Sequence, residues 1–133
     1  MSALELAQSL IKIKSVSPND EGCFDLIEAQ LIPLGFAIER VPELNCETLL
    51  AKFGDSGKVF CFLGHTDIVP SGPEEEWTSP PFEANIIDGE LIGRGAADMK
   101  GSVAVFIESL KKFLKEYPKP NFQIWIMLTS NEE

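Results

Sequence analysis

Two apolar segments of the chain each run into a cluster of polar residues. Residues 59–63 lead into Gly-His-Thr-Asp at 64–67, and residues 122–128 lead into Thr-Ser-Asn-Glu-Glu at 129–133. Uncharged runs of this kind predict strands that are covered on both faces. In open α/β sheets the functional groups lie just beyond the carboxyl ends of such strands. The two polar clusters are therefore expected to meet at one edge of a sheet.

The chain between these strands has the pattern of a parallel crossover. Residues 85–92 contain the Asp-Gly pair of a tight hairpin, and apolar residues then recur at helical spacing over residues 103–117. Pro118 and Pro120 end that helix, and a final strand begins at Phe122. Strand, hairpin, helix and strand in this order predict two parallel strands.

The first half of the chain predicts two helices and two short strands. The expected elements are a helix with a Ser2-Glu5 capping box, a helix from Ser17-Pro18 to about Pro33, strands at 36–41 and 48–53, and a surface loop at 70–81. A chain of 133 residues suits a single domain. We therefore expect an α/β sandwich in which a mostly parallel mixed sheet lies between helices.

Composition narrows the class of partner. The 11 basic and 21 acidic residues give a formal net charge of -10, which argues against nucleic acid because phosphate binding needs lysine and arginine. No apolar run approaches the roughly 18 residues of a membrane span, and no basic leader precedes an apolar core, so no membrane partner is expected. Cys23, Cys46 and Cys61 have no paired spacing, which indicates a reducing, cytoplasmic compartment.

A further carboxylate lies in the glycine-rich segment 93–101. The sequence Gly-Arg-Gly-Ala-Ala-Asp-Met-Lys-Gly places Asp98 among residues with little bulk. Such residues permit tight turns and a close approach of the backbone to an ion or ligand. Asp98 is therefore a candidate site residue, to be considered with the two polar clusters.

Together, the histidine and the acidic residues predict a metal site. Alone, His65 would more often be a hydrogen-bonded structural residue, and Glu132 with Glu133 an exposed pair. Two unit charges about 4 Å apart repel by roughly 4 kcal/mol at an effective dielectric constant near 20, so carboxylates gathered with Asp98 at one edge favour a divalent cation. Mixed nitrogen and oxygen ligands suit zinc, with manganese or cobalt as alternatives.

The neighbouring acids are expected to differ in role. Asp67, two residues after His65, can hold the far nitrogen of the imidazole and so fix the tautomer of a metal-bound histidine. On an extended segment the side chains of Glu132 and Glu133 point to opposite sides. One of the two can then bind metal while the other faces a substrate.

Four motifs together resemble the two-zinc aminoacylase and carboxypeptidase family. They are Gly64–Pro70, Trp77 with Pro81-Phe82, Gly93–Gly101 and Thr129–Glu133, in the family's order and at its spacing over nearly the whole chain. Asn131 stands where aspartate is common in the family. The resemblance implies a zinc-peptidase-like catalytic domain that holds two divalent metal ions.

The resemblance also implies a role for each site residue. His65 would bind one zinc, Glu133 the other, and Asp98 would bridge both. Asp67 would support His65, and Glu132 would be the general base. The peptide bond that follows the bridging Asp98 would be cis.

The reaction implied by the resemblance is hydrolysis of an amide in a small N-acyl amino acid. The base takes a proton from water and returns it to the leaving amine. In the family, further metal ligands and a second domain that mediates homodimerisation follow the Glu-Glu pair. We therefore expect residues 1–133 to be a truncated, N-terminal part of the metallohydrolase catalytic domain, which binds zinc weakly and is nearly inactive alone.

Two other hypotheses remain open at this point. A sister deacylase, acting for example on acetylornithine, would use the same metal core. A non-catalytic fragment would instead bind a partner through an uncovered sheet edge, as exposed strands readily do.

Overall fold

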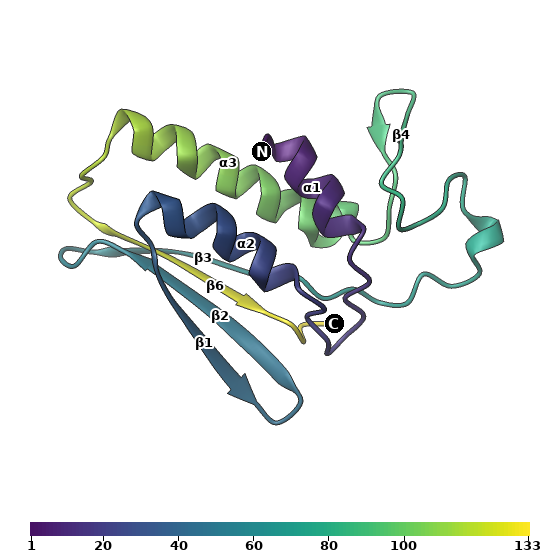
Figure 1. Cartoon of the computed structure of the whole chain (residues 1–133), viewed down its shortest axis with the longest axis horizontal. Coiled ribbons are helices and arrows are strands. Elements are labelled where there is room, and N and C mark those ends of the chain that lie inside the picture. The colour runs from purple at the N-terminus through teal and green to yellow at the C-terminus, as the bar shows by residue number, and fades with distance from the viewer.

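The computed structural model describes residues 1–133 and has the expected α/β class (Figure 1). Its elements in chain order are α1 (Ala3–Ile11), α2 (Cys23–Leu31), a 3-10 turn (Ile32–Leu34), β1 (Ala37–Glu43), β2 (Cys46–Phe53), β3 (Val59–His65), a second 3-10 turn (Glu74–Glu76), β4 (Ile86–Ile87), β5 (Glu90–Leu91), a π-helical turn (Ala96–Lys100), α3 (Gly101–Glu116) and β6 (Gln123–Thr129). None of the α-helices combines the length and the apolar character that crossing a membrane requires.

The main sheet is mixed and has the strand order β1-β2-β6-β3. β3 and β6 are parallel and are joined through the β4-β5 hairpin and α3, which confirms the predicted crossover. β1 pairs antiparallel with β2, and β2 pairs antiparallel with β6. The predicted mixed sheet is confirmed, and β1, β6 and β3 run in one direction while β2 runs in the other. The connection between β1 and β2 is only Leu44-Asn45, which permits a hairpin and no crossover.

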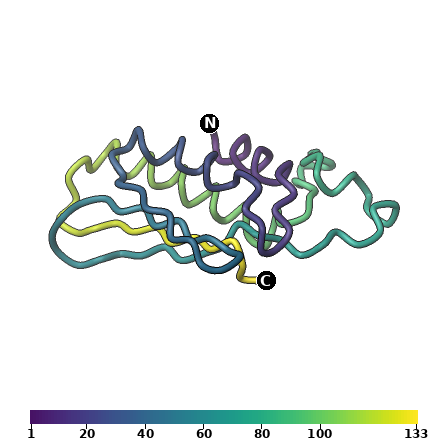
Figure 2. The backbone as a smooth tube through the Cα atoms, turned by 60° about the horizontal axis from the view of Figure 1, so that its bottom comes forward, coloured from purple at the N-terminus to yellow at the C-terminus, as the bar shows by residue number.

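All three α-helices lie on the same side of the main sheet (Figure 2). The buried core lies between these helices and the inner face of the sheet; its largest members are Leu6, Leu10, Phe24, Ile27, Leu31, Leu49, Ile107, Ile126 and Leu128. Along β6, buried residues alternate with half-buried ones. The prediction that both apolar strands are covered on both faces is therefore wrong for this chain, in which no helix lies on the outer face.

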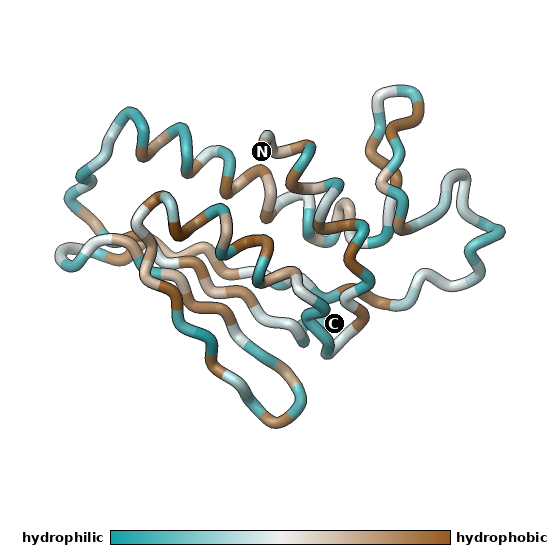
Figure 3. Tube along the Cα trace, viewed as in Figure 1, coloured by the Kyte–Doolittle hydropathy of each residue, from teal (hydrophilic) through white to brown (hydrophobic).

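The edge strand β3 is the most exposed of the apolar strands. Its side chains at Val59, Phe60 and Leu63 are exposed, and only His65 at its end is buried. Beyond β3 the chain makes a long excursion before it reaches β4, and this connection is white to teal over most of its length when coloured by hydropathy (Figure 3). The expected surface loop at 70–81 lies in this connection.

The two N-terminal helices begin in different ways. At α1 the predicted capping box is present, since the Ser2 hydroxyl accepts from the Glu5 amide and the Glu5 carboxylate accepts from the Ser2 amide. The predicted start of the second helix at Ser17-Pro18 is wrong. That helix begins only at Cys23, where the Asp20 carboxylate accepts from the amides of Gly22 and Phe24 at 3.0 Å each.

Replacement of Ile27 by alanine tests the importance of this core. Ile27 is fully buried on α2, and its truncation is expected to lower the free energy of unfolding by about 2–5 kcal/mol, through lost burial and a residual cavity. Ile32→Ala is a matched control, because the same side chain is exposed there and its loss is expected to change stability by no more than about 0.5 kcal/mol. Urea denaturation measures both, and equal losses would contradict the assignment of the core.

Candidate active site

The two polar clusters meet because their strands are parallel neighbours. In the register of β3 and β6, His65 lies opposite Thr129, so both strands end at the same edge of the sheet. The Thr66 amide then donates to the Thr129 carbonyl at 3.1 Å, which keeps the two chains together just beyond the last pair. The prediction that residues 64–67 and 129–133 meet at one edge is confirmed.

Asp98 reaches the same edge from the turn Ala96–Lys100 that precedes α3, in which Asp98 and Met99 depart from helical backbone geometry. The peptide bond between Asp98 and Met99 is cis, as the family resemblance implies. Gly95 begins the turn with φ +80°, a backbone conformation that glycine adopts without a steric penalty. At the far end of the turn, a Cβ on Gly101 would lie 2.4 Å from the Ala96 carbonyl oxygen. The glycines therefore serve the tight turn that presents Asp98.

Lys100 anchors this turn to the N-terminal helix. Its fully buried side chain donates to the carbonyl oxygens of Leu10 at 2.8 Å and Ile13 at 2.7 Å. Burial lowers the pKa of Lys100, since a charged amine loses its hydration inside the protein. Two carbonyls at the end of α1 thus fix a residue only two positions from Asp98. Sequence reasoning did not assign a role to Lys100.

His65 presents one ring nitrogen to the acidic side chains. Its side chain is only 5% exposed, and Nδ1 lies 3.0 Å from the backbone carbonyl oxygen of Asp67. A carbonyl can only accept a hydrogen bond, so Nδ1 carries the proton, and the lone pair of a neutral ring is on Nε2. Nε2 lies 3.1 Å from Asp98 Oδ1 and 3.4 Å from Glu132 Oε2.

Glu132 and Glu133 both lie close to His65. One ligand atom from each of these three residues can be chosen so that all lie within 4.8 Å of one another. The prediction that the two glutamates diverge is therefore wrong. β6 ends at Thr129, so the glutamates follow the strand and do not share its alternation. His65 thus lies close to the predicted base Glu132 and to the predicted ligand Glu133, and Asp98 approaches the same ring at Nε2.

Asp67 is fully buried, and its carboxylate contacts the glutamates more than the histidine. It accepts from the Glu132 amide at 3.1 Å and from the Glu133 amide at 3.1 Å, and it also accepts from the Ser17 hydroxyl. Its nearest carboxylate oxygen is 3.5 Å from His65 Nδ1, farther than its own carbonyl. Asp67 thus orients the imidazole through its backbone carbonyl, whereas the sequence predicted that its carboxylate would do so. Sequence reasoning did not identify Ser17, whose Ser-Pro pair is typical of a helix start.

The donor set has the chemistry of a divalent cation site. In the tautomer with the proton on Nδ1, Nε2 offers its lone pair beside the carboxylate oxygen of Asp98, and the Glu132 carboxylate lies close to the same nitrogen. Asp98 and Glu132 are 74% and 57% exposed, so an ion can reach them from solvent. Imidazole nitrogen with carboxylate oxygen suits zinc and its neighbours among the transition metals.

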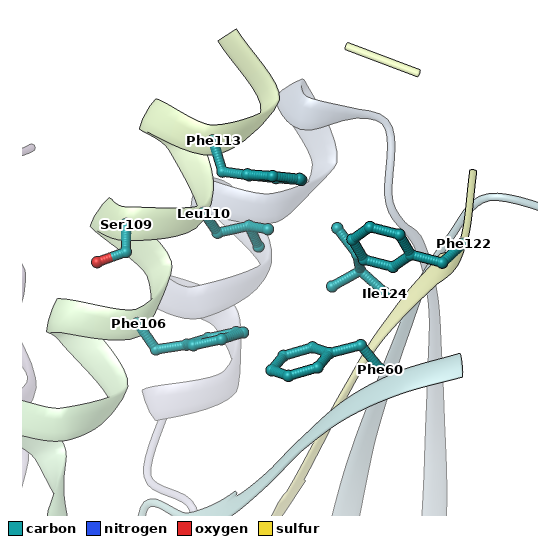
Figure 4. Close-up of a pocket in the computed structure, with 7 residues that line it drawn as sticks. All are labelled: Phe60, Phe106, Ser109, Leu110, Phe113, Phe122 and Ile124. Atoms are coloured by element: carbon teal, nitrogen blue, oxygen red, sulfur yellow. The ribbon is translucent and has the colours of Figure 1, made fainter. Parts of the chain in front are cut away.

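An apolar pocket elsewhere in the molecule has none of these groups. The pocket drawn in Figure 4 lies between α3 and the strands β3 and β6. Apart from Ser109, its lining is apolar: Phe60, Phe106, Leu110, Phe113, Phe122 and Ile124. It therefore offers burial to an apolar group but neither acid-base nor metal chemistry.

The chain matches the model of the peptidase family M20/M25/M40 over residues 61–133, which is more than half of its length. It belongs to this family. The matched region contains all of the candidate ligands and the proposed base. The resemblance drawn from the four motifs is thereby confirmed at the level of the family.

Curated relatives of this family member carry the name succinyl-diaminopimelate desuccinylase. The protein of that name from Hydrogenovibrio crunogenus is 52% identical over 131 residues, which cover 98% of this chain and 35% of the relative. Its counterpart from Alkalilimnicola ehrlichii is 48% identical over 130 residues, with the same two coverages. This M20 chain thus spans about a third of the length of the curated relatives it matches.

Solved structures share the fold of this M20 chain. Human carnosine dipeptidase 1 matches with a TM-score of 0.85 at 23% identity, covering 98% of this chain and 32% of the other. The M20 family metallo-carboxypeptidase Sso-CP2 from Sulfolobus solfataricus matches with a TM-score of 0.80 at 21% identity, with coverages of 96% and 30%. At these identities the likeness establishes the fold alone.

Alanine substitution at two glycines tests how the turn before Asp98 is packed. Gly95 and Gly89 have φ of +80° and +83°, so alanine at either should lose about 1–2 kcal/mol of stability through left-handed backbone. At Gly95 an added Cβ would also lie 2.6 Å from Ile68 Cγ2, whereas at Gly89 it would meet nothing. Gly95→Ala should therefore cost about 1–3 kcal/mol more than Gly89→Ala in urea denaturation. Equal costs would show that Ile68 does not restrain the turn.

Proposed function

We propose that this chain forms part of the catalytic domain of a zinc-dependent amide hydrolase with succinyl-diaminopimelate desuccinylase activity. The observation that carries the proposal is the convergence of His65, Asp98, Glu132 and Glu133 at the carboxyl ends of two parallel strands. The desuccinylase relatives, at about half identity over nearly the whole chain, support the substrate. The reaction would convert N-succinyl-LL-diaminopimelate and water into succinate and LL-diaminopimelate, a step of lysine biosynthesis.

The proposed site holds two divalent cations, zinc in the first place, with cobalt or manganese as alternatives. His65 would bind one cation through Nε2, Glu133 would bind the other, and Asp98 would bridge them. The exposure of Nε2 to carboxylates only, with Nδ1 committed to the Asp67 carbonyl, supports the role of His65. The divalent cations would supply Lewis-acid polarisation of the amide carbonyl and would lower the pKa of the attacking water.

Glu132 is the proposed general base. Its carboxylate, 3.4 Å from His65 Nε2, lies among the proposed ligands and is more than half exposed, so substrate and water can reach it. It would accept a proton from the attacking water at a carboxylate oxygen. It would then return that proton to the nitrogen of the leaving amine, because an amide expels its amine only as a neutral species.

The proposed ligand count sets the expected affinity. Each cation would have two protein ligands from this chain, Asp98 together with either His65 or Glu133. Catalytic zinc usually has three. We therefore propose that residues 1–133 alone bind zinc weakly and turn over little substrate. The homodimer expected of the longer enzyme stays a prediction.

A cytoplasmic location is proposed for the same enzyme. The three cysteines are unpaired, and one of them, Cys61, is exposed on the edge strand. Free thiols of this kind are typical of a reducing compartment. A sister deacylase acting on an acetylornithine-type substrate would use the same proposed metal core, but the relatives named above favour the desuccinylase.

Zinc titration of this chain tests the roles of the two glutamates. Glu133→Gln is expected to weaken zinc binding by about tenfold or more, or about 1.4 kcal/mol, because an amide oxygen is a poorer ligand than a carboxylate. Glu132→Gln is expected to leave the affinity close to that of the unmodified chain, as is the exposed control Glu75→Gln. Isothermal titration calorimetry measures all four proteins, and equal losses at Glu132 and Glu133 would contradict the division of roles.

A chimera tests the proposed reaction. In it, this chain replaces the aligned segment of the Hydrogenovibrio crunogenus desuccinylase, and hydrolysis of N-succinyl-LL-diaminopimelate is followed. Glu132→Gln in the chimera is expected to lower kcat by about 10²–10⁴-fold with the zinc content unchanged, because the base is lost while the proposed ligands remain. A kcat near that of the unmodified chimera would rule out Glu132 as the base.

A further inference from the structure

The N-terminal segment Ser15–Pro18 runs directly beside the site. Val16 forms a parallel β-bridge with Ile68. In this bridge the Ser17 amide donates a hydrogen bond to the Ile68 carbonyl at 3.1 Å. The Ile68 amide in turn donates to the Ser15 carbonyl at 3.0 Å. The Ser15 hydroxyl also donates to the Thr66 carbonyl at 2.8 Å. This segment therefore extends the sheet edge locally and follows the chain that carries His65 and Asp67.

The same segment also contacts the end of the chain. The Ser130 hydroxyl donates to the Pro18 carbonyl at 2.9 Å, and Ser130 is almost completely buried. Two hydrogen bonds with Glu47, each of 3.0 Å, also hold Ser130. The Glu47 amide donates to the Ser130 hydroxyl, and the Ser130 amide donates to the Glu47 carbonyl. The residue that precedes Asn131 and the two glutamates is thus fixed between β2 and the Ser15–Pro18 segment.

The Asp67 carboxylate joins the two contacts. One of its oxygens, Oδ2, accepts from the Ser17 hydroxyl, the Glu132 amide and the Glu133 amide. A carboxylate that is fully removed from water needs such donors, because an ionised group without them costs several kcal/mol. Ser17 is the only side chain among the donors, and it comes from a segment fifty residues away.

We infer that Ser17 is a positioning residue, which orients the Asp67 carboxylate so that its oxygens hold the backbone amides of Glu132 and Glu133. Without the hydroxyl the carboxylate is free to turn about its Cβ–Cγ bond, and both amides lose a fixed acceptor. The backbone that carries the proposed base and ligand then loses its fixed direction. The consequence for zinc rests on the proposed function, whereas the contact between Ser17, Asp67 and the two amides does not.

The test compares Ser17→Ala, Ser17→Thr and the control Ser9→Ala in the 133-residue chain. Ser9 is a fair control because its hydroxyl also donates to a carbonyl, that of Glu5 at 2.8 Å, but lies away from the site on α1. The first measurement follows the amide protons of Glu132 and Glu133 by NMR, both their chemical shifts and their exchange with deuterated water. The second is the affinity for zinc alone by calorimetry.

Ser17→Ala is expected to shift both amide resonances and to remove their protection from exchange. It should also weaken zinc binding by about tenfold, the lower range for loss of a group that supports a ligand. Ser17→Thr keeps the hydroxyl and should restore both measurements, while Ser9→Ala should alter neither. Should Ser17→Ala fail to fold, Ser17→Cys gives the same measurements, because it keeps the shape of the side chain, with a somewhat larger atom, and has only a weak donor.

Unchanged resonances and exchange of the two amides in Ser17→Ala or Ser17→Cys would overturn the inference. So would a failure of Ser17→Thr to restore them, since the effect would then come from packing and not from the hydroxyl. If the unmodified chain binds no zinc, the proposed metal site fails, but the amide measurements still decide the role of Ser17. The two proposals therefore fail by different observations.

Discussion

The buried carboxylate of Asp67 is the constraint on which the site depends. A fully buried carboxylate is tolerated only where hydrogen-bond donors replace water, and here the donors come from two parts of the sequence that lie far from Asp67 and from each other. Ser17 precedes α2, Asp67 follows β3, and the two glutamates follow β6. Satisfying one buried anion therefore requires that the N-terminal segment and the ends of two parallel strands meet at one place.

Lys100 brings the fourth part of the site to the same place by a second buried contact. Its ammonium donates to two carbonyls at and just beyond the end of α1, and each of these carbonyls also accepts from a backbone amide, that of Ile13 or Ser15. The chain from α1 continues directly into Ser15 and Ser17, so Lys100 and Asp67 restrain opposite ends of one short segment. The same N-terminal segment thus helps to position both Asp98 and the two glutamates, although these residues lie far apart in the sequence.

The parts of this arrangement that sequence could predict are those set by local pattern. The crossover between β3 and β6, the length of α3 and the capping box of α1 follow from periodicity and from side-chain hydrogen bonds within one turn. The parallel crossover in turn brings His65 to Glu132 and Glu133. Local pattern failed at Ser17-Pro18, because the hydrogen bond of that serine is to a residue fifty positions later. It failed at β3 as well, because an apolar run does not reveal whether a strand is central or at an edge.

The exposure of the acidic cluster limits the electrostatic repulsion within it. Asp98 and Glu132 are mostly exposed, so their repulsion is nearer the roughly 1 kcal/mol expected at 4 Å in water than the roughly 4 kcal/mol expected in a partly buried site. The one fully buried acid, Asp67, is satisfied by neutral donors. The fold is therefore held by its core and by the Asp67 hydrogen bonds, and the exposed oxygens and Nε2 stay free to bind a ligand. The proposed cation would add to the stability of the folded chain by mass action, and its affinity would rise with the number of protein ligands.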